Sequence, residues 1–119
     1  MVTAKFEYIR DKQTLVMNVK GHASFADLGK DPVCAGASVL AMTVAQCAVD
    51  LGERGMLQKK PNVTVRNGRV TVIIKPKTEY LYMALSLFGF GQRGMQLLEE
   101  SYPAHVRLLP FETATAASK

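Results

Sequence analysis

The chain has little from which to build thiol, imidazole or metal chemistry. Its 119 residues include two cysteines, Cys34 and Cys47, two histidines, His22 and His105, and no tryptophan. So few cysteines exclude a disulfide scaffold, and no C-x-x-C or H-x-x-x-H spacing is present to hold a metal ion. We therefore expect no metal and no cofactor. Any nucleophilic chemistry must come from these four side chains.

Excess charge is also modest. Fifteen Lys and Arg against ten Asp and Glu give a formal net charge of +5, which suits either ordinary surface solvation or work near a polyanion such as RNA. The first residues lack an apolar signal segment. The uncharged run at 32–49 contains polar residues and weakly apolar alanines, which favours a buried core helix over a membrane span. We expect a cytoplasmic protein with reduced thiols.

Hydrophobic residues make up 48% of the sequence, enough for one folded domain. We place that domain at residues 1–112 and expect the small, polar tail at 113–119 to fray. No internal repeat is long enough to indicate a solenoid.

Two β-hairpins are predicted. Residues 2–9 and 14–20 alternate apolar with polar and form the first, with its turn at 11–13. Asn67-Gly68 is a strong two-residue turn signal at the centre of the second, which covers 62–75. Its register makes four pairs of residues face each other: Val65 and Val70, Val63 and Val72, Thr64 and Thr71, Arg66 and Arg69.

Two long helices are predicted between and after the hairpins. Asp31 caps the first, and Pro32 takes its first position, where no N–H is needed. Thr78 caps the second, and residues 106–109 form a fifth strand. The order indicates an α+β domain of two layers, in which both helices cover one face of an antiparallel or mixed sheet.

Cys34 is the first candidate nucleophile. It becomes the third residue of the first helix, at the positive end of the helix dipole, where the thiolate is favoured over the thiol. A buried structural cysteine is the alternative. His22 begins the loop that leads into this helix and can act as a general base if the loop brings it to the thiol.

The remaining Cys and His are predicted to have structural or surface roles. If Cys47 lies on the same helix as Cys34, thirteen residues separate them by about 20 Å along its axis, beyond disulfide reach. We therefore expect Cys47 to be an inert core residue. A thiol-based redox sensor needs a resolving cysteine, and Cys47 is badly placed for that role, so this function is the least favoured. His105 is expected at the surface.

Two further patterns suggest binding functions. Residues 89–94 match G-x-G-x-x-G, but a helix precedes them where a dinucleotide site needs a strand. The same stretch resembles the backbone-clamping loop of KH domains, although close packing of a helix on the sheet explains it better. Basic residues gather around the second hairpin, where an anionic partner would relieve their repulsion: Lys59, Lys60, Arg66, Arg69, Lys75 and Lys77. Solvation of a sheet edge is the alternative.

Residues 21–38 resemble the signature of the bacterial ribosomal-processing cysteine protease (Prp) family. Gly21-His22-Ala23 matches the G-H-A element, and Asp31-Pro32-Val33-Cys34-Ala35 matches the D-x-V-C-A element after a short loop with a glycine. Ser38 follows the cysteine by four residues, as in the family. Pro32 departs from the usual aliphatic residue, and Ala37 departs from the usual valine.

The resemblance implies an activity and a site. The catalytic cysteine falls on Cys34 and the catalytic histidine on His22, with Gly21, Asp31 and Ser38 as supporting or substrate-site residues. Members of the family are homodimers that remove the N-terminal extension of a large-subunit ribosomal protein, cutting between a Phe-Phe pair and Ala. The expected function is therefore a cysteine endopeptidase, with weak contact to ribosomal RNA as one explanation of the positive charge. A non-catalytic basic RNA- or ribosome-binding module is the alternative.

Overall fold

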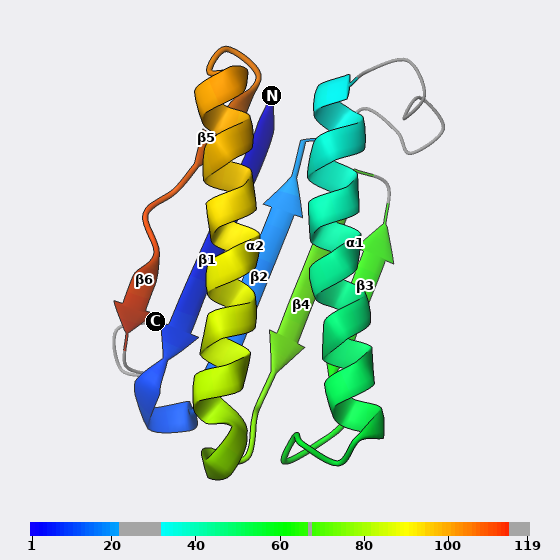
Figure 1. Cartoon of the computed structure of the whole chain (residues 1–119), viewed down its shortest axis with the longest axis vertical. Helices are drawn as coiled ribbons and strands as arrows, with labels where there is room; N and C mark the ends of the chain where they lie inside the picture. Colours follow the sequence, from blue (N-terminus) through cyan, green and yellow to red (C-terminus); the bar gives the residue numbers. More distant parts are fainter. Residues whose placement is uncertain (22–31, 67, 115–119) are drawn as a thin grey trace.

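The computed structural model describes residues 1–21, 32–66 and 68–114 (Figure 1). Two helices pack side by side on one face of a six-stranded sheet, which confirms the predicted α+β architecture. The elements in chain order are β1 (Val2–Ile9), η1 (Arg10–Lys12), β2 (Thr14–Lys20), α1 (Pro32–Glu53), β3 (Asn62–Arg66), β4 (Arg69–Ile74), η3 (Thr78–Tyr80), α2 (Leu81–Ser101), β5 (Val106–Leu108) and β6 (Glu112–Ala114).

Both predicted hairpins form. β1 pairs with β2, and β3 pairs with β4 in the predicted register, with Arg66 directly opposite Arg69. Asn67 of the predicted turn lies outside the described residues. β2 joins the hairpins through antiparallel pairing with β4, which gives the strand order β3-β4-β2-β1-β5.

The chain end adds two short parallel strands to β1. β5 confirms the predicted fifth strand and pairs with the start of β1, while β6 pairs with its end. The sheet is therefore mixed. β6 includes Thr113 and Ala114, which the sequence analysis assigned to the polar tail. Ala114 is buried opposite Ile9, so backbone pairing and burial order this short segment despite its composition.

The core lies between the sheet and the helices. Alternate residues of the central strands point toward the helix layer and are fully buried, among them Phe6, Met17 and Val72. α1 has the length and apolar composition of a membrane span. Its buried residues other than Cys34 and Ser38 belong to the same core cluster as those of the sheet, as expected of a core helix.

The start of the second helix differs from the prediction. Thr78 does not cap α2, because residues 78–80 form a turn of 3-10 helix and α2 begins at Leu81 without a side-chain cap. The Thr78 hydroxyl instead accepts a hydrogen bond from the Gln13 side-chain amide, at 3.2 Å. The Thr78 hydroxyl, which the preference of threonine for helix N-caps assigned to α2, therefore takes part in a long-range contact instead.

Candidate active site

Cys34 lies in the first turn of α1. Pro32 is the first residue of the helix, as predicted, so Cys34 is the third. Its side chain is 7% exposed, and Ser38, one turn further on the same helix face, is 2% exposed. This face turns toward the sheet. The positive end of the α1 dipole therefore lies beside a nearly buried thiol; the dipole favours the thiolate, whereas burial favours the neutral thiol.

Gly21 ends the strand that leads toward His22. Its φ of +103° lies outside the range that residues with a side chain readily adopt. A Cβ at this position would overlap the backbone oxygen of Met1. The Gly21 N–H donates to the carbonyl oxygen of Gly68 at 3.0 Å, which fixes the end of β2 against the β3–β4 connection. Only glycine meets both the conformational and the spatial requirement.

The end of β2 and the start of α1 lie at the same end of the molecule (Figure 1). Cys34 and Gly21 thus flank the segment that carries two other predicted site residues, His22 and Asp31. Both of these lie outside the described residues. The Cys34–His22 dyad and the roles of Asp31 stay predictions.

The other cysteine and histidine lie where the sequence analysis expected them, with one difference. Cys47 is on α1 with Cys34, and neither forms a disulfide. Cys47 is half-buried rather than fully buried, because α1 turns it toward the α1–α2 boundary near Met83 and Leu87. His105 is exposed. No group of three or more potential metal ligands occurs among the described residues.

The glycines of the G-x-G-x-x-G stretch lie within α2, so they form no loop. A Cβ on Gly91 would stand 2.8 Å from Cγ2 of Val44 and 3.2 Å from Cε2 of Phe6. One on Gly94 would stand 2.5 Å from Cδ2 of Leu40. These glycines let α2 approach α1 and β1 closely. The packing explanation is therefore correct, and the nucleotide and KH-loop interpretations are wrong.

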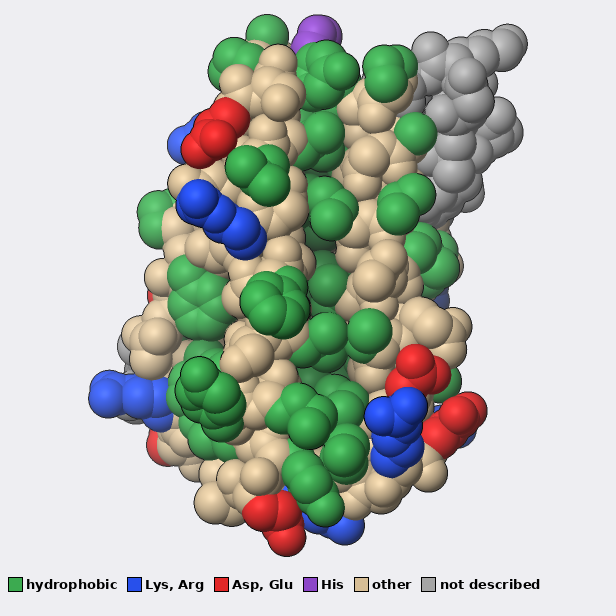
Figure 2. Space-filling model, in the orientation of Figure 1, with side chains coloured by type: hydrophobic (Ala, Val, Ile, Leu, Met, Phe, Trp, Pro, Cys, Tyr) green, Lys and Arg blue, Asp and Glu red, His purple; other side chains and the backbone are tan. Residues whose placement is uncertain are grey.

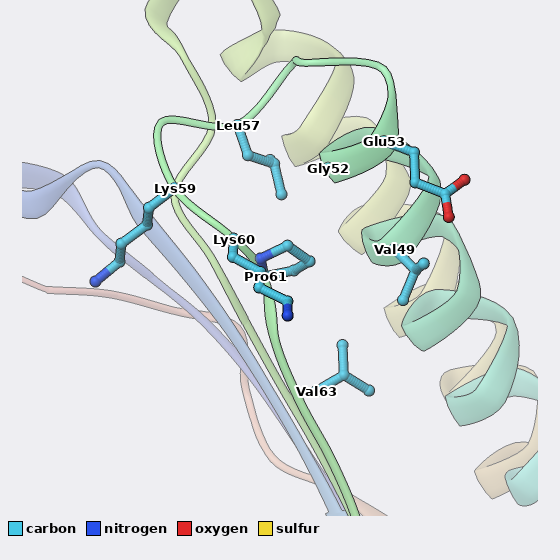
Figure 3. Close-up of a pocket in the computed structure, with 8 residues that line it drawn as sticks. All are labelled: Val49, Gly52, Glu53, Leu57, Lys59, Lys60, Pro61 and Val63. Atoms are coloured by element: carbon cyan, nitrogen blue, oxygen red, sulfur yellow. The ribbon is translucent and has the colours of Figure 1, made fainter.

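A cavity of about 680 Å³ opens at the opposite end of α1, beside Lys59 and Lys60 of the predicted basic cluster. Figure 3 shows side chains of α1, β3 and the connection between them around it. Val49, Leu57, Pro61 and Val63 form its apolar lining beside Lys59 and Lys60. Cys34 lies fifteen residues before Val49 on α1, which corresponds to about 22 Å along the helix axis. This cavity is therefore separate from Cys34.

The model of a family described as "Cysteine protease Prp" matches residues 1–107. The fold resembles that of the ribosomal processing protease Prp from Staphylococcus aureus in complex with a covalently linked product peptide, with a TM-score of 0.60 and 22% identity, covering 93% of this chain and 99% of that chain.

Two further solved structures have the same fold. The S. aureus Prp complex with a substrate peptide gives a TM-score of 0.61 at 22% identity, over 93% of this chain and 99% of that one. SMU.848 from Streptococcus mutans gives 0.63 at 23% identity, over 95% of both chains. No curated protein sequence matches the chain.

Proposed function

This chain belongs to the cysteine protease Prp family, and from that membership we propose that it removes the short N-terminal extension of a large-subunit ribosomal protein during ribosome assembly. The family makes it a cysteine protease. The substrate is supported by the similar fold of the S. aureus ribosomal processing protease, which binds a substrate peptide. The observation that carries the proposal is the position of Cys34, a nearly buried thiol in the first turn of α1.

In the proposed mechanism, His22 takes the proton of Cys34 and the thiolate attacks the carbonyl carbon of the scissile peptide bond. The positive end of the α1 dipole stabilises the negative charge that develops on the carbonyl oxygen. His22 then gives the proton to the leaving amine, and the acyl group remains on sulfur. A water molecule, deprotonated by His22, hydrolyses this thioester and regenerates the thiol.

Three further residues hold the nucleophile in position. Asp31 is proposed to cap α1, which would fix the first turn and with it Cys34. Ser38 supports the same helix one turn later, where it is almost completely buried. Gly21 allows β2 to end in the close backbone contact that begins the segment with His22.

The proposed cleavage site lies between a Phe-Phe pair and Ala, as the family resemblance implies. The test is incubation of the chain with a peptide that contains Phe-Phe-Ala, followed by mass spectrometry of the products. We expect cleavage before Ala. A matched peptide with Gly-Gly-Ala at the same place should remain intact. Equal cleavage of both peptides would contradict the proposed specificity.

The enzyme is further proposed to act as a cytoplasmic homodimer. Support for a second copy comes from the outer surface of the helix layer, where hydrophobic side chains follow the seam between α1 and α2 (Figure 2). Six large hydrophobic residues of the two helices are exposed: Val39, Met42, Tyr82, Met83, Phe90 and Leu97. Monomeric proteins seldom leave such a contiguous apolar surface in water. Pairing of two helix layers would cover it.

A further inference from the structure

Basic residues form a row across the sheet on the face without helices. Side chains that are paired in register point to the same face of a sheet. Arg66 of β3 is opposite Arg69 of β4, and Arg69 is opposite Lys20 of β2. Lys20 is opposite Thr3 of β1, and Thr3 is opposite Arg107 of β5. One row therefore crosses five strands and presents four cations and one threonine.

These residues alternate along their strands with core residues that face the helices. Val19, Val70 and Val106 are each next to a member of the row and are buried at 1% exposure or less. Lys20, Arg66, Arg69 and Arg107 are accordingly on the open face, and all four are exposed. We call these four residues the cationic row.

In the described part of the chain the cationic row has no acidic partner, whereas Lys5 forms an ion pair with Glu112 at 3.0 Å. Glu112 is opposite Glu7, and Glu7 is four residues along β1 from the row, about 13 Å away. Glu7 and Glu112 therefore lie away from the cationic row, toward the other end of the open face. Three cations in directly opposed positions repel each other, and a bound polyanion would remove that cost.

The surroundings of the cationic row fit a nucleic acid backbone. The next row of the same face consists of polar residues, Lys5, Asn18, Thr71 and Thr64. A membrane surface would require apolar side chains beside the cations. Large aromatic side chains for base stacking are equally missing from these two rows. The chemistry offered is that of phosphate contacts along a line, without readout of bases.

We propose that the cationic row binds the phosphate backbone of RNA without sequence preference. This deepens the RNA contact expected from the net charge, and it rests on the proposed ribosomal function only for its biological setting. β2 ends and α1 begins at the same end of the molecule as the row (Figure 1). RNA bound there would hold the protease with its Cys34 end at the RNA surface.

The test measures fluorescence anisotropy of a labelled single-stranded RNA of mixed sequence with the full chain, over a series of salt concentrations. Each phosphate contact to a single strand contributes about −0.7 to the slope of log K against log salt. Four contacts predict a slope of about −2.8. The double substitution Arg66→Gln and Arg69→Gln should halve the slope and weaken binding about 25-fold at 0.1 M salt. Arg107→Gln alone should reduce the slope by about 0.7.

The matched control is Lys59→Gln with Lys60→Gln, which removes the same charge at the opposite end of the β3–β4 hairpin. It should leave the slope unchanged. Equal loss in this control, an unchanged slope in the Arg66 and Arg69 variant, or tighter binding to vesicles of anionic lipid than to RNA would overturn the proposal. Cleavage of the Phe-Phe-Ala peptide is measured separately on the unsubstituted chain, so the failure of either proposal is distinguishable from that of the other.

Discussion

At the scale of single residues, position within a helix separates two otherwise identical side chains. Cys34 and Cys47 lie on the same helix, but only Cys34 is in its first turn. The dipole of a helix acts mainly on groups within its first and last turns. This gives the two thiols different expected reactivity.

Cys34→Ala should lower kcat/KM for the Phe-Phe-Ala peptide by at least about 10³-fold, because the covalent step is lost. Cys47→Ala is the control and should keep nearly full activity. The measurement is the rate of product formation by mass spectrometry. Comparable losses in the two variants would show that the effect comes from altered folding of α1 rather than from loss of a nucleophile.

Gly21 and Gly55 both have positive φ, but their surroundings differ. Gly55 has a φ of +70° and open space where a Cβ would be, whereas a Cβ at Gly21 would overlap the Met1 backbone. Gly55→Ala should lower the free energy of unfolding by about 1 kcal/mol from backbone strain alone. Gly21→Ala should lower it by about 3 kcal/mol, since strain and overlap add. Urea denaturation of both variants checks this, and equal values would argue against the Met1 contact.

At the scale of elements, the second helix is determined by packing more than by propensity. Glycine is a poor residue for a helix interior, but α2 continues through Gly89, Gly91 and Gly94 without interruption. Two of the three are needed where α2 approaches its neighbours, and the third faces open space.

Alanine substitutions in α2 should therefore have opposite effects. Gly89→Ala adds a Cβ in open space and should raise the free energy of unfolding by about 0.5–1 kcal/mol through helix propensity. Gly91→Ala brings a Cβ to 2.8 Å from the Val44 side chain and should lower it by about 1–3 kcal/mol through overpacking. Thermal unfolding followed by circular dichroism gives both values. The close-packing explanation is wrong if Gly91→Ala stabilises the protein as Gly89→Ala does.

At the scale of the whole molecule, the two layers leave different surfaces uncovered. The sheet carries the cationic row on its open face, and the helix layer exposes large apolar side chains (Figure 2). Figure 1 shows these surfaces on opposite sides of the molecule, so that each can bind a different partner. The proposals assign RNA to the first and a second copy of the chain to the other.

Pairing through the helix layer predicts a particle of twice 13.0 kDa by size exclusion with light scattering. Phe90→Ser combined with Val39→Ser should shift it toward the monomer, since both side chains are exposed on that layer at 76% and 66%. Val65→Ser is the control, because Val65 is also an exposed valine but belongs to β3. A monomeric unsubstituted chain would refute the dimer proposal. Equal dissociation by Val65→Ser would refute its assignment to the helix layer.

Local physics made much of the structure predictable from sequence. Alternation of apolar and polar residues located β1 and β2, a two-residue turn signal set the β3–β4 register, and Pro32 marked the start of α1. These features depend on neighbouring residues, and so does the placement of Cys34 in a first helical turn. The pairing with His22 was suggested by its position in the loop before α1 and then by the family resemblance, and it stays a prediction.

The tertiary structure decided what depends on contacts between distant segments. It showed that α2 begins after Thr78 and that β6 pairs with β1. It also showed that Gly91 lacks room for a side chain because Val44 and Phe6 pack against it. The repulsive pair Arg66 and Arg69 was evident from the hairpin, but its extension to Lys20 and Arg107 required the strand order. Local patterns determine which residues alternate along a strand, whereas burial and pairing across the whole chain determine which strands become neighbours.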